Sequence, residues 1–304
     1  MLRRILTFAC LNIIIVLTLS IVLSIFQVSP YLTRHGLSVS SLLIFSLLWG
    51  FGGAFIALFF SKRFARMAMR VRLIKQGKTW DNNETRLVRL VEEICKKAKF
   101  PHTIELGIFQ SKTLNAFATG RSQKTSMIAV SSALIETMND NELSAVLAHE
   151  LSHIRSGDMV SMTLLQGTIN SFVIFLSRII AYAITQMGRG QKSNNRSGSY
   201  FSFYITTFIT EIILMIPGLM LLAFVSRKRE FKADASAARV TSPASMIGAL
   251  KTLKLGAIAS KKEALELKPY AAAMINKSQK SKFRFFATHP PIEERIKQLE
   301  ALDV

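Results

Sequence analysis

The stretch LAHELSHIRSGDM, residues 147–159, places two histidines four positions apart, at His149 and His153. On a helix these side chains lie one turn apart on the same face, close enough for both imidazoles to bind one metal ion. Glu150 follows the first histidine, and in the pattern HExxH this glutamate stays off the metal and accepts a proton from a metal-bound water. The stretch therefore predicts a zinc site with a general base beside it.

The sequence around this stretch predicts a helix, which the motif requires. Asn139, with Glu142 three residues later, resembles a capping box. Apolar residues follow at helical spacing, at Leu143, Val146, Leu147 and Ile154. The alternative is a chance match, in which two histidines lie on a helix surface beside a solvated glutamate.

The composition indicates a membrane protein with a soluble part. Half of the 304 residues are hydrophobic, and the mean hydropathy is +0.31, too apolar for an ordinary soluble chain. The net charge of +20 is typical of nucleic-acid partners, but many basic residues cluster beside apolar runs and no nucleic-acid motif occurs. We therefore expect a positive membrane-flanking surface and no nucleic acid. The two cysteines lie far apart, which suits a reducing compartment.

Four apolar segments, 5–28, 37–60, 160–187 and 200–225, are each long enough for a transmembrane helix. A cleaved signal peptide is the alternative for the first segment, but its apolar run exceeds roughly 7–15 residues and no A-x-A site follows. Basic residues precede the first segment and follow the second and fourth. By the positive-inside rule, both termini and the metal-binding helix are expected in the cytoplasm.

The second apolar pair carries two charges, Arg178 and Glu211, each about ten residues from the polar loop at 188–199. In an antiparallel pair of helices both charges reach a similar depth, ~15 Å from the loop, so we expect them to form an ion pair. The alternative role for these two charges is an ion or proton path. The alternative location for the whole hairpin is against the soluble domain, without spanning the bilayer.

The soluble part contains two further predicted features. Short β-like runs at 103–109, 114–119 and 126–131, separated by polar turns, predict a small antiparallel sheet. Farther along, RKREFKAD places Glu230 and Asp234 four residues apart. Glu230 can complete a His/His/Glu zinc site, and Asp234 can accept the free ring N–H of a ligand histidine. The alternative for both is a pair of exposed helical carboxylates.

With these motifs in order, the sequence resembles the HtpX family of bacterial inner-membrane zinc metalloproteases, relatives of the CaaX prenyl proteases. The resemblance covers nearly the whole chain. It rests on the two apolar pairs and on NAFATG at 115–120, HELSHIRSGDM at 149–159, REFKAD at 229–234 and THPP at 288–291. It implies one Zn²⁺ per subunit, and endopeptidase activity on misfolded or damaged membrane proteins or unfolded polypeptides, in quality control and stress response.

The resemblance also implies a fold and a domain order. We expect an α+β, mainly α, integral membrane protein with about four transmembrane helices and a cytoplasmic, gluzincin-like zinc protease domain that contains the small antiparallel sheet. Residues 1–60 would form the first hairpin and 160–225 the second. Residues 61–159 and 226–304 would form the two parts of the protease domain. The sequence does not indicate an oligomeric state.

Two further roles follow from the resemblance. Asn115 and Ala116 resemble the edge strand that hydrogen-bonds the substrate backbone in related enzymes; the alternative is an ordinary turn asparagine. His289 resembles a histidine that donates a hydrogen bond to the developing oxyanion, and Arg295 is a second candidate for that role. For His289 the alternative is a histidine at the entry of a helix.

Two other functions remain to be distinguished from proteolysis. One is a non-enzymatic membrane chaperone or scaffold with a structural zinc, for which Glu150→Gln would have no effect. The other is a transporter with Arg178 and Glu211 on its path, although only four candidate spans and no repeat are present.

Overall fold

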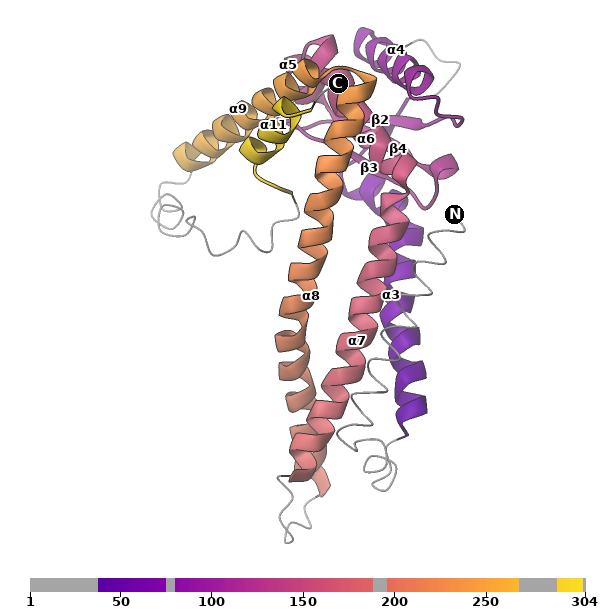
Figure 1. Cartoon of the computed structure of the whole chain (residues 1–304), viewed down its shortest axis with the longest axis vertical. Helices are drawn as coiled ribbons and strands as arrows, with labels where there is room; N and C mark the ends of the chain where they lie inside the picture. The colour runs from indigo at the N-terminus through magenta and orange to yellow at the C-terminus, as the bar shows by residue number, and fades with distance from the viewer. Residues whose placement is uncertain (1–37, 75–79, 188–195, 268–288, 303–304) are drawn as a thin grey trace. The chain divides into compact units, whose positions relative to one another are not determined.

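The computed structural model describes residues 38–74, 80–187, 196–267 and 289–302 (Figure 1). The chain divides into two compact units. One consists of the segment ending at Ala57 together with Ser161–Leu222, and the other consists of Leu58–Val160 and Ala223–Val304. The first predicted transmembrane segment, 5–28, lies outside the described residues.

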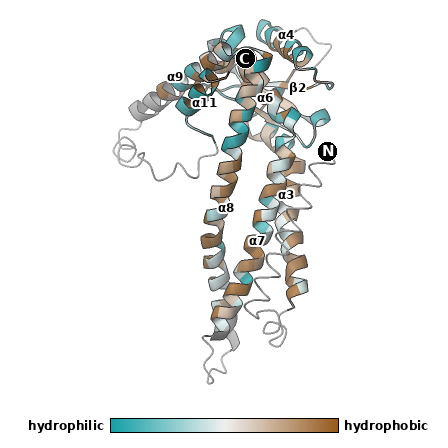
Figure 2. Cartoon of the chain, in the orientation of Figure 1, coloured by the Kyte–Doolittle hydropathy of each residue, from teal (hydrophilic) through white to brown (hydrophobic). Residues whose placement is uncertain are grey.

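Three long apolar helices supply the first unit: α3 (Val39–Ala68), α7 (Asp158–Met187) and α8 (Arg196–Val240). Within the described part of the chain, these three are long and apolar enough to cross a membrane. Figure 2 shows apolar residues along α3, α7 and much of α8, in contrast to the more polar α4. The chain is therefore a membrane protein, and three of its four predicted spans lie within described helices.

Small residues allow α3 to approach α7 closely. A Cβ added to Gly50 would lie 2.7 Å from Cα of Ser171, which is too close for any side chain larger than that of glycine. A Cβ on Gly52 or Gly53 would meet nothing within 4 Å. One of the three glycines in this segment is thus required by close helix packing.

The sheet of the second unit has four strands in the order β1-β2-β4-β3. Its strands are β1 (Arg72–Leu73), β2 (Glu105–Phe109), β3 (Ala116–Thr119) and β4 (Met127–Ser131). Strands β1 and β2 pair antiparallel, as do β3 and β4, but β2 and β4 pair in parallel. The prediction of a small antiparallel sheet is therefore wrong in its pairing, because the sheet is mixed.

The burial of β4 explains this order. All five of its residues are buried, so the strand occupies the centre, where it can pair on both sides. Strand β3 returns beside β4 on the edge and does not pair with its predecessor β2. Strands β2 and β4 run in the same direction because β3 reverses the chain between them.

Both faces of the sheet are apolar, and one of them carries the main core. Leu106 and Ile108 of β2, with Ile128 and Val130 of β4, pack in one buried cluster with residues of several helices. These helices are α4 (Asn82–Lys97), α5 (Ser132–Thr137), α6 (Asp140–Ser156), the C-terminal end of α8, α9 (Pro243–Leu267) and α11 (Ile292–Glu300). On the opposite face Phe109, Met127 and Ala129 pack against Val71.

Arg86 of α4 fixes the start of α6. Its guanidinium donates to the carbonyls of Ile135 and Met138, at 2.6 and 2.7 Å, and to the carboxylate of Asp140 at 2.6 Å. Asp140 is the first residue of α6, so this contact holds the beginning of the helix that carries the HExxH motif.

Candidate metal centre and active site

Helix α6 has a defined beginning and end. Asn139 accepts the Glu142 N–H at 3.0 Å, and the Glu142 carboxylate accepts the Asn139 N–H at 3.4 Å, which confirms the predicted capping box. At the other end Gly157 takes a left-handed conformation, with φ of 61°, that glycine adopts without strain. The chain turns there, and α7 begins at the next residue, Asp158.

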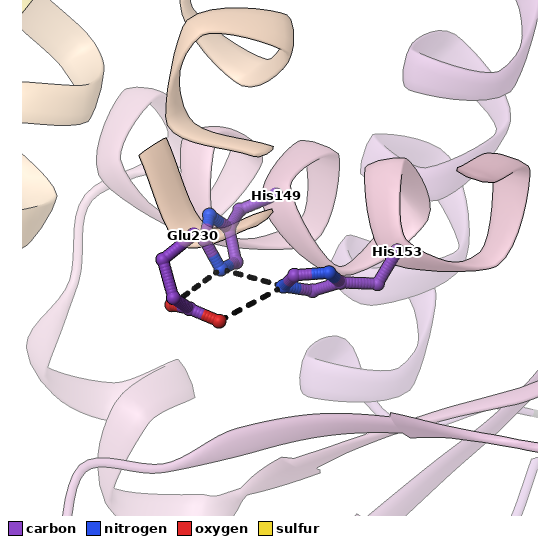
Figure 3. Close-up of side chains that lie close together, drawn as sticks. All are labelled: His149, His153 and Glu230. Carbon is purple, nitrogen blue, oxygen red and sulfur yellow. Dashed lines mark hydrogen bonds and ion pairs between the residues drawn. The ribbon is translucent and has the colours of Figure 1, made fainter. Parts of the chain in front are cut away.

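The structure brings His149 and His153 of α6 together with Glu230 of α8 (Figure 3). The Nε2 atoms of the histidines are 3.1 Å apart. The Glu230 oxygens lie 3.6 Å from His149 Nε2 and 3.4 Å from His153 Nε2. The three ligand atoms all lie within 4.8 Å of one another, so they can bind one metal ion.

The polar atoms at this site fit a bound cation. Glu230 is buried, and its Oε2 forms no hydrogen bond within the described residues. A buried carboxylate oxygen without a partner is costly, and a metal ion would satisfy it. Burial by itself raises the pKa of Glu230, but contacts with His149, His153 and His289 more than offset this effect, so that the pKa lies well below its ordinary value. Two imidazoles and one carboxylate are one of the ligand sets of catalytic zinc sites.

Asp234, which the sequence offers as the acceptor of a ring N–H, lies behind the first histidine. Its Oδ1 is 2.9 Å from Nδ1 of His149, and its carboxylate accepts two hydrogen bonds from Arg295, at 2.6 and 2.7 Å. The contact of Asp234 with Nδ1 leaves Nε2 of His149 directed at Glu230. Arg295, which the sequence offers for the oxyanion, is thus already bound to Asp234.

Asp158 lies behind the second histidine in the same way, and the sequence reasoning missed it. Its Oδ2 is 2.7 Å from Nδ1 of His153 and 2.9 Å from a guanidinium nitrogen of Arg229. Each histidine therefore has a carboxylate near its Nδ1, and each carboxylate contacts an arginine, but only the contact of His153 has the alignment of a hydrogen bond. The available signal was the acidic residue five positions after His153, directly behind the glycine that ends the helix.

Glu150 lines a cavity of about 140 Å³ together with His149, Glu230 and His289. Burial raises the pKa of the Glu150 carboxyl, and the neighbouring His149 and His153 lower it, with a net increase above the ordinary value. A glutamate with a raised pKa beside a metal site suits proton transfer near neutral pH.

Asn115 and Ala116 line the same cavity. Asn115 accepts the N–H of Ser131 on β4 at 2.9 Å, so in this antiparallel ladder the backbone groups of the next residue, Ala116, point to the other edge. Strand β3 is an edge strand, and that edge has no neighbouring strand within the described residues.

His289 lies at the rim of the site. Its Nδ1 is 2.9 Å from Oε2 of Glu230, without the alignment of a hydrogen bond, and 69% of its side chain is exposed. Arg178 and Glu211 lie in the other unit, where Nη1 of Arg178 donates to Oε1 of Glu211 at 2.9 Å.

Comparison with known proteins identifies the family. The model of peptidase family M48 matches residues 81–303. A protein named Protease HtpX homolog from Polaromonas naphthalenivorans is 42% identical over 299 residues, which cover 98% of each chain. Protease HtpX of Hahella chejuensis is 40% identical over 302 residues, covering 98% of this chain and 99% of the relative.

A solved structure shares the fold. The crystal structure of S. mikatae Ste24p matches with a TM-score of 0.56 and 17% identity, over 96% of this chain and 66% of that one. This chain therefore spans about two thirds of the length of Ste24p. With the family model over most of the chain and full-length relatives at about 40% identity, the chain belongs to peptidase family M48, as an HtpX-type membrane metalloprotease.

Proposed function

We propose that this metalloprotease is a zinc-dependent endopeptidase of the bacterial inner membrane, which cleaves misfolded or damaged membrane proteins on the cytoplasmic side. His149, His153 and Glu230 hold one zinc ion per chain. The observation that carries this proposal is the cluster of three ligand atoms beside a cavity that Glu150 lines, next to an edge of β3 that has no neighbouring strand in the described part of the chain.

The proposed reaction is hydrolysis of a peptide bond. Zinc, when bound, supplies a Lewis acid that polarises a carbonyl and lowers the pKa of water. Glu150 accepts the proton of the attacking water and passes it to the leaving amine. Ala116 hydrogen-bonds the substrate backbone at the edge of β3, with Asn115 beside it, and His289 steadies the oxyanion from the rim.

Strand addition suits unfolded substrates. A backbone edge recognises main-chain N–H and C=O groups, which every extended polypeptide presents and a folded protein hides. The apolar helices support a location in the bilayer, and the basic residues around 62–78 and 226–232 support a cytoplasmic site. Damaged membrane proteins would thus meet the site at the membrane surface.

The test compares purified wild type with Glu150→Gln, both prepared in detergent under chelator and then given zinc. We expect wild type to cleave an unfolded test protein only after zinc is added. Glu150→Gln should bind zinc with similar affinity and cleave at least about 100-fold more slowly, because it lacks the general base.

Glu136→Gln is the matched control. Glu136 is exposed on α5, outside the cavity, so the same chemical change should leave the cleavage rate as in wild type. Equal inactivity of wild type and Glu150→Gln, with zinc bound by both, would support a non-enzymatic scaffold with a structural zinc and contradict this proposal.

A further inference from the structure

A large basic cavity lies at the end of α3, and it shares no lining residue with the cavity at the metal centre. Its volume is about 1000 Å³, the size of a ligand site. Six cationic side chains line this basic cavity: Lys62, Arg63, Arg66, Arg70, Arg121 and Lys124.

The positive charge of the basic cavity is largely uncompensated. Glu105 is the one carboxylate among its lining residues, and it forms an ion pair with Lys62. The other five cations form no ion pair within the described residues, and Arg121 stacks over the ring of Phe59 at 4.7 Å. Five like charges around one hollow repel one another, and a bound anion would relieve that repulsion.

Arg70, which lines the basic cavity, has a strained backbone conformation. The N–H of Val71 donates to the carbonyl of Arg66 at 3.0 Å, so α3 ends in the turn whose left-handed residue is usually glycine. Here that residue is Arg70, with φ of 50°. A side chain held in this conformation against its preference is often functional, and this one lines the basic cavity.

The neighbouring residues are of the kinds expected where a membrane-spanning helix leaves the bilayer. Residues 39–60 of α3 carry no charge and rise roughly 33 Å, close to the ~30 Å thickness of the hydrocarbon core. Lys62 is the first charge after this run. Phe59, Phe60 and Phe64 are exposed beside it, as aromatic side chains are at the interface of membrane and water.

We propose that the basic cavity binds the phosphate headgroup of an anionic phospholipid. Arg63, Arg66, Arg70, Arg121 and Lys124 surround the phosphate, and the exposed phenylalanines lie among the acyl chains. A soluble phosphate ester has the same charged group, but the aromatic side chains at the end of an apolar helix favour a lipid. The bound lipid would hold the end of α3 and the four-stranded sheet of the second unit at the membrane surface.

The experiment follows thermal unfolding of the full-length, zinc-loaded protein in micelles of a non-ionic detergent. Phosphatidylglycerol, phosphatidylcholine or glycerol 3-phosphate is added in increasing amounts. A ligand of the folded state raises the unfolding midpoint. We expect a saturable rise of several degrees with phosphatidylglycerol and none with the other two.

The variant removes two cations without a strained replacement. Arg66→Gln with Arg70→Gly places glycine where the helix end prefers it, so the fold is kept. The amount of phosphatidylglycerol at half-maximal shift should rise about 25-fold, since each basic residue near a lipid surface contributes roughly fivefold in affinity. A midpoint in phosphatidylcholine no lower than that of wild type shows that this variant is folded.

Helix α4 offers a matched control. It also ends in a cationic left-handed residue, Lys99 with φ of 49°, followed by a bond from Phe100 N–H to the carbonyl of Cys95. Lys96→Gln with Lys99→Gly makes the same changes outside the basic cavity, and it should alter the half-maximal amount less than twofold. Equal losses in both variants, no loss in either, or an equal shift with glycerol 3-phosphate would each overturn the proposal.

Discussion

The two histidines of the candidate metal centre have the same kinds of neighbouring side chains. Each Nδ1 faces an aspartate, and each aspartate contacts an arginine: Asp234 with Arg295, and Asp158 with Arg229. An aspartate in this position fixes the tautomer and ring orientation of the histidine and raises its basicity as a ligand.

Asp158→Asn should therefore weaken zinc binding. The amide keeps the size of the side chain but loses the charge that faces His153, and such changes typically cost about 10–100-fold in metal affinity. Competition with a chelator of known affinity measures the change without an activity assay. Asp234→Asn is the reference variant, with a loss of the same size. A loss for Asp234→Asn with none for Asp158→Asn would show that the contact with His153 is incidental.

Sequence reasoning predicts a role for Asp234 beside a ligand histidine, but it does not predict one for Asp158. Asp234 is visible because it lies on the same helix as Glu230, one turn away. Asp158 follows the left-handed Gly157, where α6 ends, so helical periodicity no longer relates it to His153. Arg229 lies in a basic run that the positive-inside rule already explains. The charge of this run does not show which of its arginines contacts Asp158.

At the level of elements, the sequence predicts the strands but not how they pair. The three strongest runs correspond to β2, β3 and β4, within two residues at each end. The order β2-β4-β3 depends on burial of β4 from both faces, which its apolar composition allows but does not require. Strand β1 has two residues, too few for a detectable pattern, and it adds the remaining edge.

The contact of Arg178 with Glu211 joins α7 to α8, and we expect it to stabilise that pair of helices. Arg178→Leu would leave Glu211 unpaired in apolar surroundings, so the unfolding midpoint in detergent should fall. Arg178→Leu with Glu211→Leu should recover part of the loss, with a coupling energy of about 0.5–3 kcal/mol from the double-mutant cycle.

A parallel cycle gives the control. The Thr185 hydroxyl donates a hydrogen bond to the carbonyl of Ala181 within α7. Because this bond does not involve Glu211, the effects of Thr185→Leu and Glu211→Leu on stability should be additive. Additivity for Arg178 and Glu211 as well would mean that their contact contributes no net stability.

At the scale of the whole molecule, the metal centre depends on two helices that lead out of its own unit. The chain leaves this unit after Val160 and returns at Ala223. Helix α7 begins five residues after His153, and α8 continues unbroken to Glu230. Glu230, the third candidate ligand, therefore lies on the helix that returns the chain from the apolar unit.

We expect α7 and α8 to cross the bilayer, so that the chain between them lies on the side of the membrane opposite to the metal centre. Each apolar part is long enough to cross, and α8 exposes Phe208, Ile212 and Ile213 by more than half. A row of exposed apolar side chains is typical of a surface that contacts lipid or another protein. A hairpin folded against the soluble domain would instead bury them against protein.

Reporter insertions distinguish these two arrangements. Alkaline phosphatase inserted after residue 191 should be active, because it folds only outside the cytoplasm, whereas the same enzyme fused after residue 304 should be inactive. Green fluorescent protein, which folds in the cytoplasm, should give the reverse pattern. Fluorescence from the insertion after residue 191, with phosphatase inactive there, would place both ends of the hairpin in the cytoplasm. Zinc-dependent cleavage by the insertion protein would show that the catalytic unit still folds, so that the reporter result describes the native topology.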